Sequence, residues 1–160
     1  MKTHEQWFEE AARVAKGSLC LDEGAMCGSV VVQDERIIGE GYNAPPLDDL
    51  SLRRCLDDRQ QYDRMKKPRF DLTCCVHAEW RAIMDALKKN TNALKGATLY
   101  FVRIDGDKKI KHSGKPFCTV CSRLALDTGI AYFALWHKEG IKRYDTKEYN
   151  MLSYEYHKRS

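Results

Sequence analysis

The sequence predicts an α/β protein in which helices pack against a mixed β-sheet. Its hydrophobic periodicity changes along the chain in the order helix, strand, strand, helix, strand, helix, strand, helix. Residues 27–33 and 97–104 are rich in β-branched and aromatic side chains, which favours buried strands. No internal repeat, low-complexity tract or linker interrupts the 160 residues. We therefore expect a single domain spanning residues 1–160.

Apolar spacing predicts the first three elements. Residues 4–16 place aromatic and alanine side chains at helical intervals, and Gly17 would end this helix. Residues 27–33 and 37–42 are apolar runs separated by an Asp-Glu turn at 34–35, a pattern typical of a β-hairpin.

A charged segment at about 44–76 separates the second predicted strand from the next helix. Its scattered leucines are compatible with a helix within 49–66 that Pro68 would end. Connections of this length are uncommon in compact domains and are often functional. We expect an insertion into the domain and not a hairpin loop.

The second half of the chain is predicted to alternate helices with strands. The predicted elements are a helix at 77–89, a strand at 97–104, a polar loop at 108–116, a helix at 119–128, a strand at 130–136 and a last helix from Asp145 or Thr146 to about His157.

Composition restricts the classes of function. Hydrophobic residues make up 43% of the chain and charged residues 31%, as in soluble globular domains. The 27 basic and 23 acidic residues give a net charge of +4, which fits a nucleotide-sized anion. A protein that grips long nucleic acid usually has a denser basic surface. No apolar run approaches the ~18–20 residues of a membrane span.

The N-terminus and the cysteines indicate a reducing compartment. Residues 1–5 lack the apolar core of a signal peptide, so we expect a cytoplasmic location. The seven cysteines are odd in number, and two of them are adjacent. Reduced thiols and metal ligands are therefore favoured over a disulfide framework.

Two short motifs supply three candidate metal ligands and one acid. His77 and Glu79 open one predicted helix, and Cys118 and Cys121 open another. Helix N-termini favour thiolates, so the two helix starts could meet at one zinc ion. Three protein ligands leave the fourth position open for water, as in catalytic zinc sites. Glu79 can then carry protons for chemistry with that water.

The same residues are also compatible with a chance match or with a closed structural zinc site. Each motif alone is common by chance, and a closed structural zinc site would need a fourth ligand. Cys74, Cys75 and His112 are conceivable fourth ligands, but a closed site has no use for the unligated Glu79. A second structural zinc is not favoured, because the remaining cysteines form no second Cys-x-x-Cys and buried cysteine often serves as a small apolar residue. These cysteines are Cys20, Cys27, Cys55, Cys74 and Cys75.

Together, the motifs resemble those of the zinc-dependent cytidine deaminase superfamily, which has His-x-Glu followed by Pro-Cys-x-x-Cys. The resemblance covers most of the chain, from Cys27 to Trp136. Two stretches resemble the deoxycytidylate (dCMP) deaminase branch of this superfamily in particular, namely Gly41-Tyr42-Asn43 and His77-Ala78-Glu79-Trp80-Arg81-Ala82-Ile83. The resemblance implies a three-layer α/β/α sandwich with a five-stranded mixed sheet. It also implies one catalytic zinc ion per chain and assembly into a homo-oligomer.

The resemblance further implies a role for each motif residue. His77, Cys118 and Cys121 would bind zinc, and Glu79 would shuttle protons. For the substrate, the backbone of Ala78 would help hold the base, and Asn43 would contact the sugar or base.

One departure from the family pattern concerns the loop that enters the site. The family has proline directly before its first cysteine, whereas Phe117 stands between Pro116 and Cys118 here. Phe117 is expected to line or reshape the base pocket. The departure therefore bears on substrate identity more than on zinc binding.

The favoured function is hydrolytic deamination of a free pyrimidine nucleotide, most like dCMP to dUMP with release of ammonia. Rival substrates are a free base or nucleoside, such as cytosine or guanine, and adenosine or cytosine within RNA or single-stranded DNA. A rival of another class is a zinc-stabilised binding module without catalysis.

Candidate contacts for a 5′-phosphate are Arg53, Arg54, Arg69, Lys115 and Arg123. The segment 154–159 could stack on bases, but a helix docked on the core is favoured.

Overall fold

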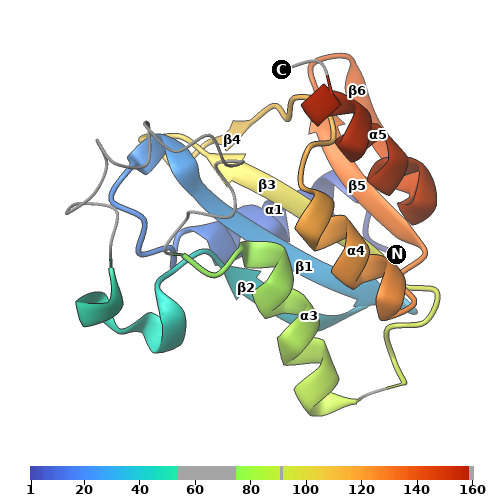
Figure 1. The fold of residues 1–160 in the computed structure, drawn as a ribbon, viewed down its shortest axis with the longest axis horizontal. Coiled ribbons are helices and arrows are strands. Elements are labelled where there is room, and N and C mark those ends of the chain that lie inside the picture. The colour runs from blue at the N-terminus through green and yellow to red at the C-terminus, as the bar shows by residue number, and fades with distance from the viewer. Residues whose placement is uncertain (54–74, 91, 159–160) are drawn as a thin grey trace.

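The computed structural model describes residues 1–53, 75–90 and 92–158, which form a mixed β-sheet with helices on both faces (Figure 1). The strands are β1 (Met26–Gln33), β2 (Arg36–Tyr42), β3 (Thr98–Ile104), β4 (Ile110–Lys111), β5 (Tyr132–His137) and β6 (Gly140–Asp145). The helices of more than one turn are α1 (His4–Ala15), α3 (Ala78–Lys89), α4 (Thr119–Asp127) and α5 (Thr146–Lys158).

The sheet has the order β2-β1-β3-β5-β6, with the two-residue β4 paired to β3 outside this row. β3 and β5 run parallel, while every other pair of neighbours is antiparallel. Helix α4 connects the parallel strands, as a crossover must. The predicted three-layer α/β/α arrangement with a five-stranded mixed sheet is therefore confirmed.

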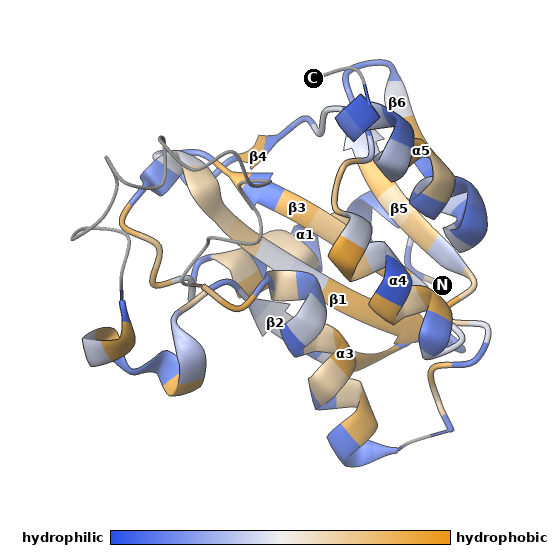
Figure 2. Cartoon of the chain, viewed as in Figure 1, coloured by the Kyte–Doolittle hydropathy of each residue, from blue (hydrophilic) through white to orange (hydrophobic). Residues whose placement is uncertain are grey.

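Two hydrophobic layers hold the helices to the sheet. On one face, Phe8 of α1 is fully buried against strand residues such as Val30. On the other face, Ile83 of α3 packs with Leu99 and with Phe133, which stacks on α5. Figure 2 shows that β1 is mostly hydrophobic, whereas α5 carries many hydrophilic residues. Among the helices of the described residues, none is both long and apolar enough to cross a bilayer.

The first helix follows from its sequence. Thr3 and Gln6 form a capping box at its N-terminus, in which each side chain bonds the other residue's backbone. The predicted apolar stripe is buried as expected, including Trp7 and Ala11.

Two parts of the strand prediction are wrong. The loop predicted at 108–116 contains β4, which pairs with the end of β3. The sequence pattern also missed β6, which forms a hairpin with β5. Most of its side chains are exposed, and it lies at an edge of the sheet, where charged residues are common. An edge strand of this kind lacks the apolar alternation that would reveal it.

The described ends of the predicted insertion lie side by side. Ala44 and Val76 form an isolated antiparallel bridge, with the Val76 N–H donating to the Ala44 carbonyl at 2.8 Å. Residues 46–48 and 50–52 form single 3-10 turns. Most of the helix predicted within 49–66 lies outside the described residues.

Helix α3 packs directly on the backbone of β2 at two glycines. A β-carbon at Gly41 would lie 2.5 Å from the backbone nitrogen of Ala82 and 2.6 Å from the Ala78 carbonyl oxygen. At Gly39, it would lie 2.2 Å from the Ala82 carbonyl oxygen. Only glycine permits this close approach, which fixes the position of the α3 N-terminus over the sheet.

Substitution of Gly41 by alanine should therefore destabilise the zinc-loaded protein. The added methyl group meets backbone atoms that cannot turn away, so we expect a loss of at least about 2 kcal/mol in the free energy of unfolding. The melting temperature should fall by roughly 4–8 °C. Gly114→Ala is the matched control, since a β-carbon there has nothing within 4 Å. Equal melting temperatures for the two variants would contradict this account of α3.

Candidate active site

The three predicted zinc ligands meet at the N-termini of two helices. His77 is the N-cap of α3, Cys118 is the N-cap of α4, and Cys121 lies in the first turn of α4. His77 Nδ1 lies 3.2 Å from the Cys121 sulfur and 3.6 Å from the Cys118 sulfur, and the two sulfurs are 2.7 Å apart. Segments that are 41 residues apart in the sequence thus present their donor atoms to one point.

These donors fit a zinc ion. Hydrogen bonding with the Cys121 side chain, together with the nearby His77 ring, lowers the pKa of Cys118. Burial raises the pKa of Cys121. Both cysteines must give up their protons to bind zinc, and the environment of Cys118 favours this more than that of Cys121. Two thiolates and an imidazole are a standard donor set for zinc.

The described residues provide three ligands and no more. All donor atoms of the group lie within 4.8 Å of one another, and no fourth His, Cys, Asp or Glu of the described chain joins it. Of the conceivable fourth ligands, Cys75 and His112 are therefore not in the group, and Cys74 lies outside the described residues. This arrangement is that of an open site.

Glu79 lies beside the metal ligands without joining them. It occupies the first turn of α3 and is 5% exposed. Burial raises the pKa of the Glu79 carboxyl to about 7, and the negative charge of Cys118 adds to this effect. The carboxylate accepts a hydrogen bond from the Cys121 thiol. The site therefore contains a buried acid that can exchange protons next to the zinc position.

Neighbouring side chains hold these groups in place. Trp80 stacks on the His77 ring, with the centroids 5.2 Å apart and an interplanar angle of 20°. Arg81 donates to Asp48 at 2.8 Å and to the Pro45 carbonyl at 2.9 Å. Arg81 thus connects the segment after β2 to helix α3 by hydrogen bonds.

Asn43 organises the segments around the site. Its side-chain oxygen accepts from the Cys27 N–H at 2.8 Å and from the Ser18 hydroxyl at 2.6 Å, and its amide nitrogen donates to the Ala25 carbonyl at 2.9 Å. One amide hydrogen remains for a sugar or base, so the contact predicted for Asn43 stays a prediction. Ala78 is the first residue of α3, and its N–H has no partner within the helix.

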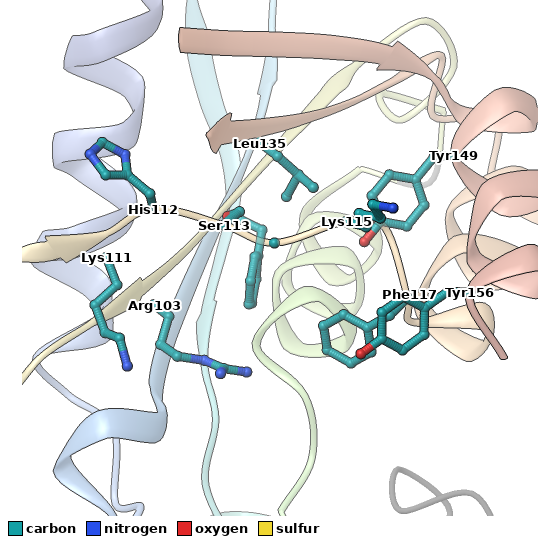
Figure 3. A pocket seen from close by; sticks show the side chains of 11 residues that line it. Arg103, Lys111, His112, Ser113, Lys115, Phe117, Leu135, Tyr149 and Tyr156 are labelled. Carbon is teal, nitrogen blue, oxygen red and sulfur yellow. The ribbon is translucent and has the colours of Figure 1, made fainter. Parts of the chain in front are cut away.

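A cavity of about 240 Å³ lies between β3, the loop that leads to Cys118, and α5 (Figure 3). Phe117, which directly precedes Cys118, lines it together with Tyr149 of α5. Burial raises the pKa of Tyr149, and the negative charges of Glu79 and of both metal-site cysteines add to this effect. The remaining lining residues are Phe101, Arg103, Lys111, His112, Ser113, Gly114, Lys115, Leu135 and Tyr156.

The C-terminal helix holds Phe117 in place. His157 Nε2 donates to the Phe117 carbonyl at 2.7 Å, and the rings of Phe117 and Tyr156 lie 6.0 Å apart. Tyr149 and Tyr156 were missed as site residues, because helical spacing predicted only that α5 docks on the core. Phe117 lines this cavity, and its predicted place in the base pocket stays a prediction.

The candidate phosphate contacts are only partly brought to the cavity. Lys115 lines it, whereas Arg53 donates to the Leu19 carbonyl and Arg123 lies beside Tyr154. Arg54 and Arg69 lie outside the described residues.

Sequence reasoning did not select Arg103 or Lys111, although both line the cavity. Arg103 could have been selected because it is a charged residue within a predicted strand, on the same face as the apolar residues Leu99 and Phe101.

An α/β/α sandwich that holds a His/Cys/Cys site and a buried glutamate at two helix N-termini defines a zinc-dependent hydrolase. Residues 1–135 match the family described as "Cytidine and deoxycytidylate deaminase zinc-binding region". The chain belongs to this family of zinc-dependent deaminases, as its motifs predicted.

Solved structures agree in fold. A cytidine deaminase from Burkholderia pseudomallei has a TM-score of 0.60 at 16% identity, covering 92% of this chain and 96% of that chain. A dCMP deaminase from the cyanophage S-TIM5, in complex with dCMP and dUMP, has a TM-score of 0.55 at 19% identity, covering 83% and 81%. At these identities the likeness shows the fold alone. Among curated protein sequences, none matches this chain significantly.

Removal of a metal ligand should release zinc. We expect wild-type protein to contain about one zinc ion per chain by elemental analysis, and His77→Ala or Cys121→Ser to bind zinc at least about 10-fold more weakly. Cys20→Ser is the control, because Cys20 is a free cysteine outside the ligand group. Two zinc ions per wild-type chain would contradict the single site, and full zinc affinity in both ligand variants would contradict the ligand assignment.

Proposed function

We propose that this protein is a zinc-dependent hydrolytic deaminase of a free pyrimidine nucleotide, most like dCMP, which it converts to dUMP with release of ammonia. The observation that carries the chemistry is the position of Glu79. Its buried carboxyl lies beside the three metal ligands and is not itself a member of the ligand group. A deaminase needs such a proton carrier, because protons must leave water and reach both the base and the departing amine.

The residues of the chain would divide the work as follows. His77, Cys118 and Cys121 hold the zinc ion, and Glu79 moves protons at its carboxylate oxygens. A zinc ion held here would lower the pKa of a coordinated water to near neutrality. Glu79 takes up a proton from water and delivers it to the ring nitrogen next to C4 of the base, while the water oxygen forms a bond to C4. Glu79 then moves the proton of the resulting hydroxyl to the amino group, so that the C4–N bond breaks, C4 keeps its oxygen as a carbonyl and ammonia leaves.

The cavity supports a small substrate. About 240 Å³ suits one nucleotide, and its wall combines the aromatic rings of Phe101, Phe117 and Tyr156 with basic side chains. Aromatic rings stack on bases, and basic groups attract phosphate. A free base or nucleoside would have no use for the basic groups.

The rival readings find less support. Residues 154–158 belong to α5, which packs against α4 and the sheet edge, so they form a docked helix and not a free arm. Together with a net charge of only +4, this does not favour a long nucleic acid as substrate. A binding module without catalysis would leave unexplained why a buried carboxyl lies unligated at the metal site.

Glu79→Gln tests the proton carrier. The amide keeps the shape of the side chain but cannot accept and release protons, so kcat should fall at least about 100-fold while zinc content and melting temperature are retained. Asp85→Asn is the control, since Asp85 lies near the other end of α3, where among the described residues it accepts hydrogen bonds from the Glu40 N–H and from Lys89. Normal deamination by Glu79→Gln would overturn the assignment.

An ammonia-release screen tests the substrate class. The zinc-loaded protein should act on dCMP in preference to CMP, deoxycytidine, cytosine, guanine and a transfer RNA. Activity confined to the transfer RNA would support the polynucleotide reading. Activity confined to deoxycytidine, cytosine or guanine would support the nucleoside or base reading. Absence of ammonia release from all six would favour the binding module.

A further inference from the structure

One wall of the cavity is cationic and contains no acid. Arg103 at the end of β3, Lys111 on β4 and Lys115 on the following loop all line it, and no Asp or Glu does. Figure 3 shows the Arg103 guanidinium extending along the cavity in the direction of Phe117 and Tyr156. Within the described chain, neither Arg103 nor Lys115 forms an ion pair.

The strand pairing makes this arrangement costly without an anion. Arg103 and Lys111 are register partners on adjacent antiparallel strands, and like charges directly opposite each other destabilise a sheet. On the other side of β3, the register partner of Arg103 is Cys27, whose pKa burial raises to about 12. This thiol therefore supplies no negative charge.

Arg103 also has an unused donor. Its Nε atom is buried and has no hydrogen-bond partner among the described residues. A buried donor without a partner costs about 1–3 kcal/mol, so a site that leaves one in place is suited to an acceptor brought by a ligand. Lys111 is partly engaged elsewhere, since its Nζ donates to the Gly24 carbonyl at 3.3 Å.

Arg103 also lies beside an aromatic part of the cavity wall. Phe101 and Arg103 lie on the same face of β3, two residues or about 6.6 Å apart along the strand. Phe117, which directly precedes the ligand Cys118, lines the cavity together with Tyr149. The cavity therefore combines an aromatic part beside Cys118 with a cationic part at Arg103.

We infer that Arg103, assisted by Lys115, binds the 5′-phosphate of the substrate and so makes the enzyme specific for nucleotides over nucleosides. This assignment rests on the proposed deaminase function, and it adds the residues that decide the substrate class. The guanidinium offers phosphate several N–H donors in a planar fork, including the Nε–H that has no partner. Lys115, which is exposed, adds a second positive charge from the loop that leads to Phe117.

The test compares dCMP with deoxycytidine in wild type, Arg103→Gln and Lys115→Gln. Loss of a charge-assisted hydrogen bond should lower kcat/KM for dCMP by about 10- to 100-fold in Arg103→Gln and by less in Lys115→Gln. The value for deoxycytidine should change less than about 3-fold in both, since no phosphate is present to lose a contact. Arg36→Gln is the matched control. It removes the same charge at the start of β2, where the register with Gln33 places it at the opposite end of the sheet.

Each outcome decides the inference. Equal losses for dCMP and deoxycytidine in Arg103→Gln, or an unchanged value for dCMP, would overturn the phosphate role while leaving the deaminase intact. A wild-type enzyme that prefers deoxycytidine would do the same. If wild type deaminated neither compound, the proposed function would fail, and binding of inorganic phosphate to the zinc-loaded protein would decide the subsite. Binding weakened by Arg103→Gln but not by Arg36→Gln would support an anion site, and no binding to wild type would overturn it.

Discussion

The N-termini of α3 and α4 meet where His77 faces Cys118 and Cys121, and the rest of the site depends on this contact. Strands β2 and β3 are each antiparallel to β1, so they run in the same direction. Helix α3 follows β2 along the chain and helix α4 follows β3, so both helices begin near the carboxyl ends of these parallel strands. Ligands of α/β proteins commonly bind at the carboxyl ends of strands. The topology thus produces the site before any ligand is considered.

Metal binding resolves an electrostatic conflict that this convergence creates. Two thiols and a carboxyl are buried together, and the negative charge of Cys118 raises the pKa of both Glu79 and Cys121. A doubly charged cation stabilises both thiolates at once and leaves the carboxyl of Glu79 free to exchange protons. The same buried environment that makes the empty cluster unfavourable therefore suits it to zinc and to proton transfer.

The sequence predicted those parts of the molecule in which chemistry and periodicity agree. The ligands and Glu79 could be found because their residue types and spacing fit zinc and because each pair opens an amphipathic helix. The edge strand β6 could not be found, because an exposed strand has no apolar alternation. The place of Arg103 in a cationic wall could not be predicted either. It depends on the pairing of Arg103 with Lys111 on the facing strand and on the loop beyond it. The sequence of either strand alone does not indicate such pairing across a polar hairpin.

The residue inserted before Cys118 links the metal site to the C-terminal helix. Phe117 separates the proline from the first cysteine ligand, and its ring lines the cavity while its carbonyl accepts a hydrogen bond from His157. Tyr156 packs against the same ring from α5. These contacts with α5 restrict the Phe117 ring to the cavity wall. The last helix, which carries no metal ligand, therefore helps to fix the shape of the cavity directly beside the ligand Cys118.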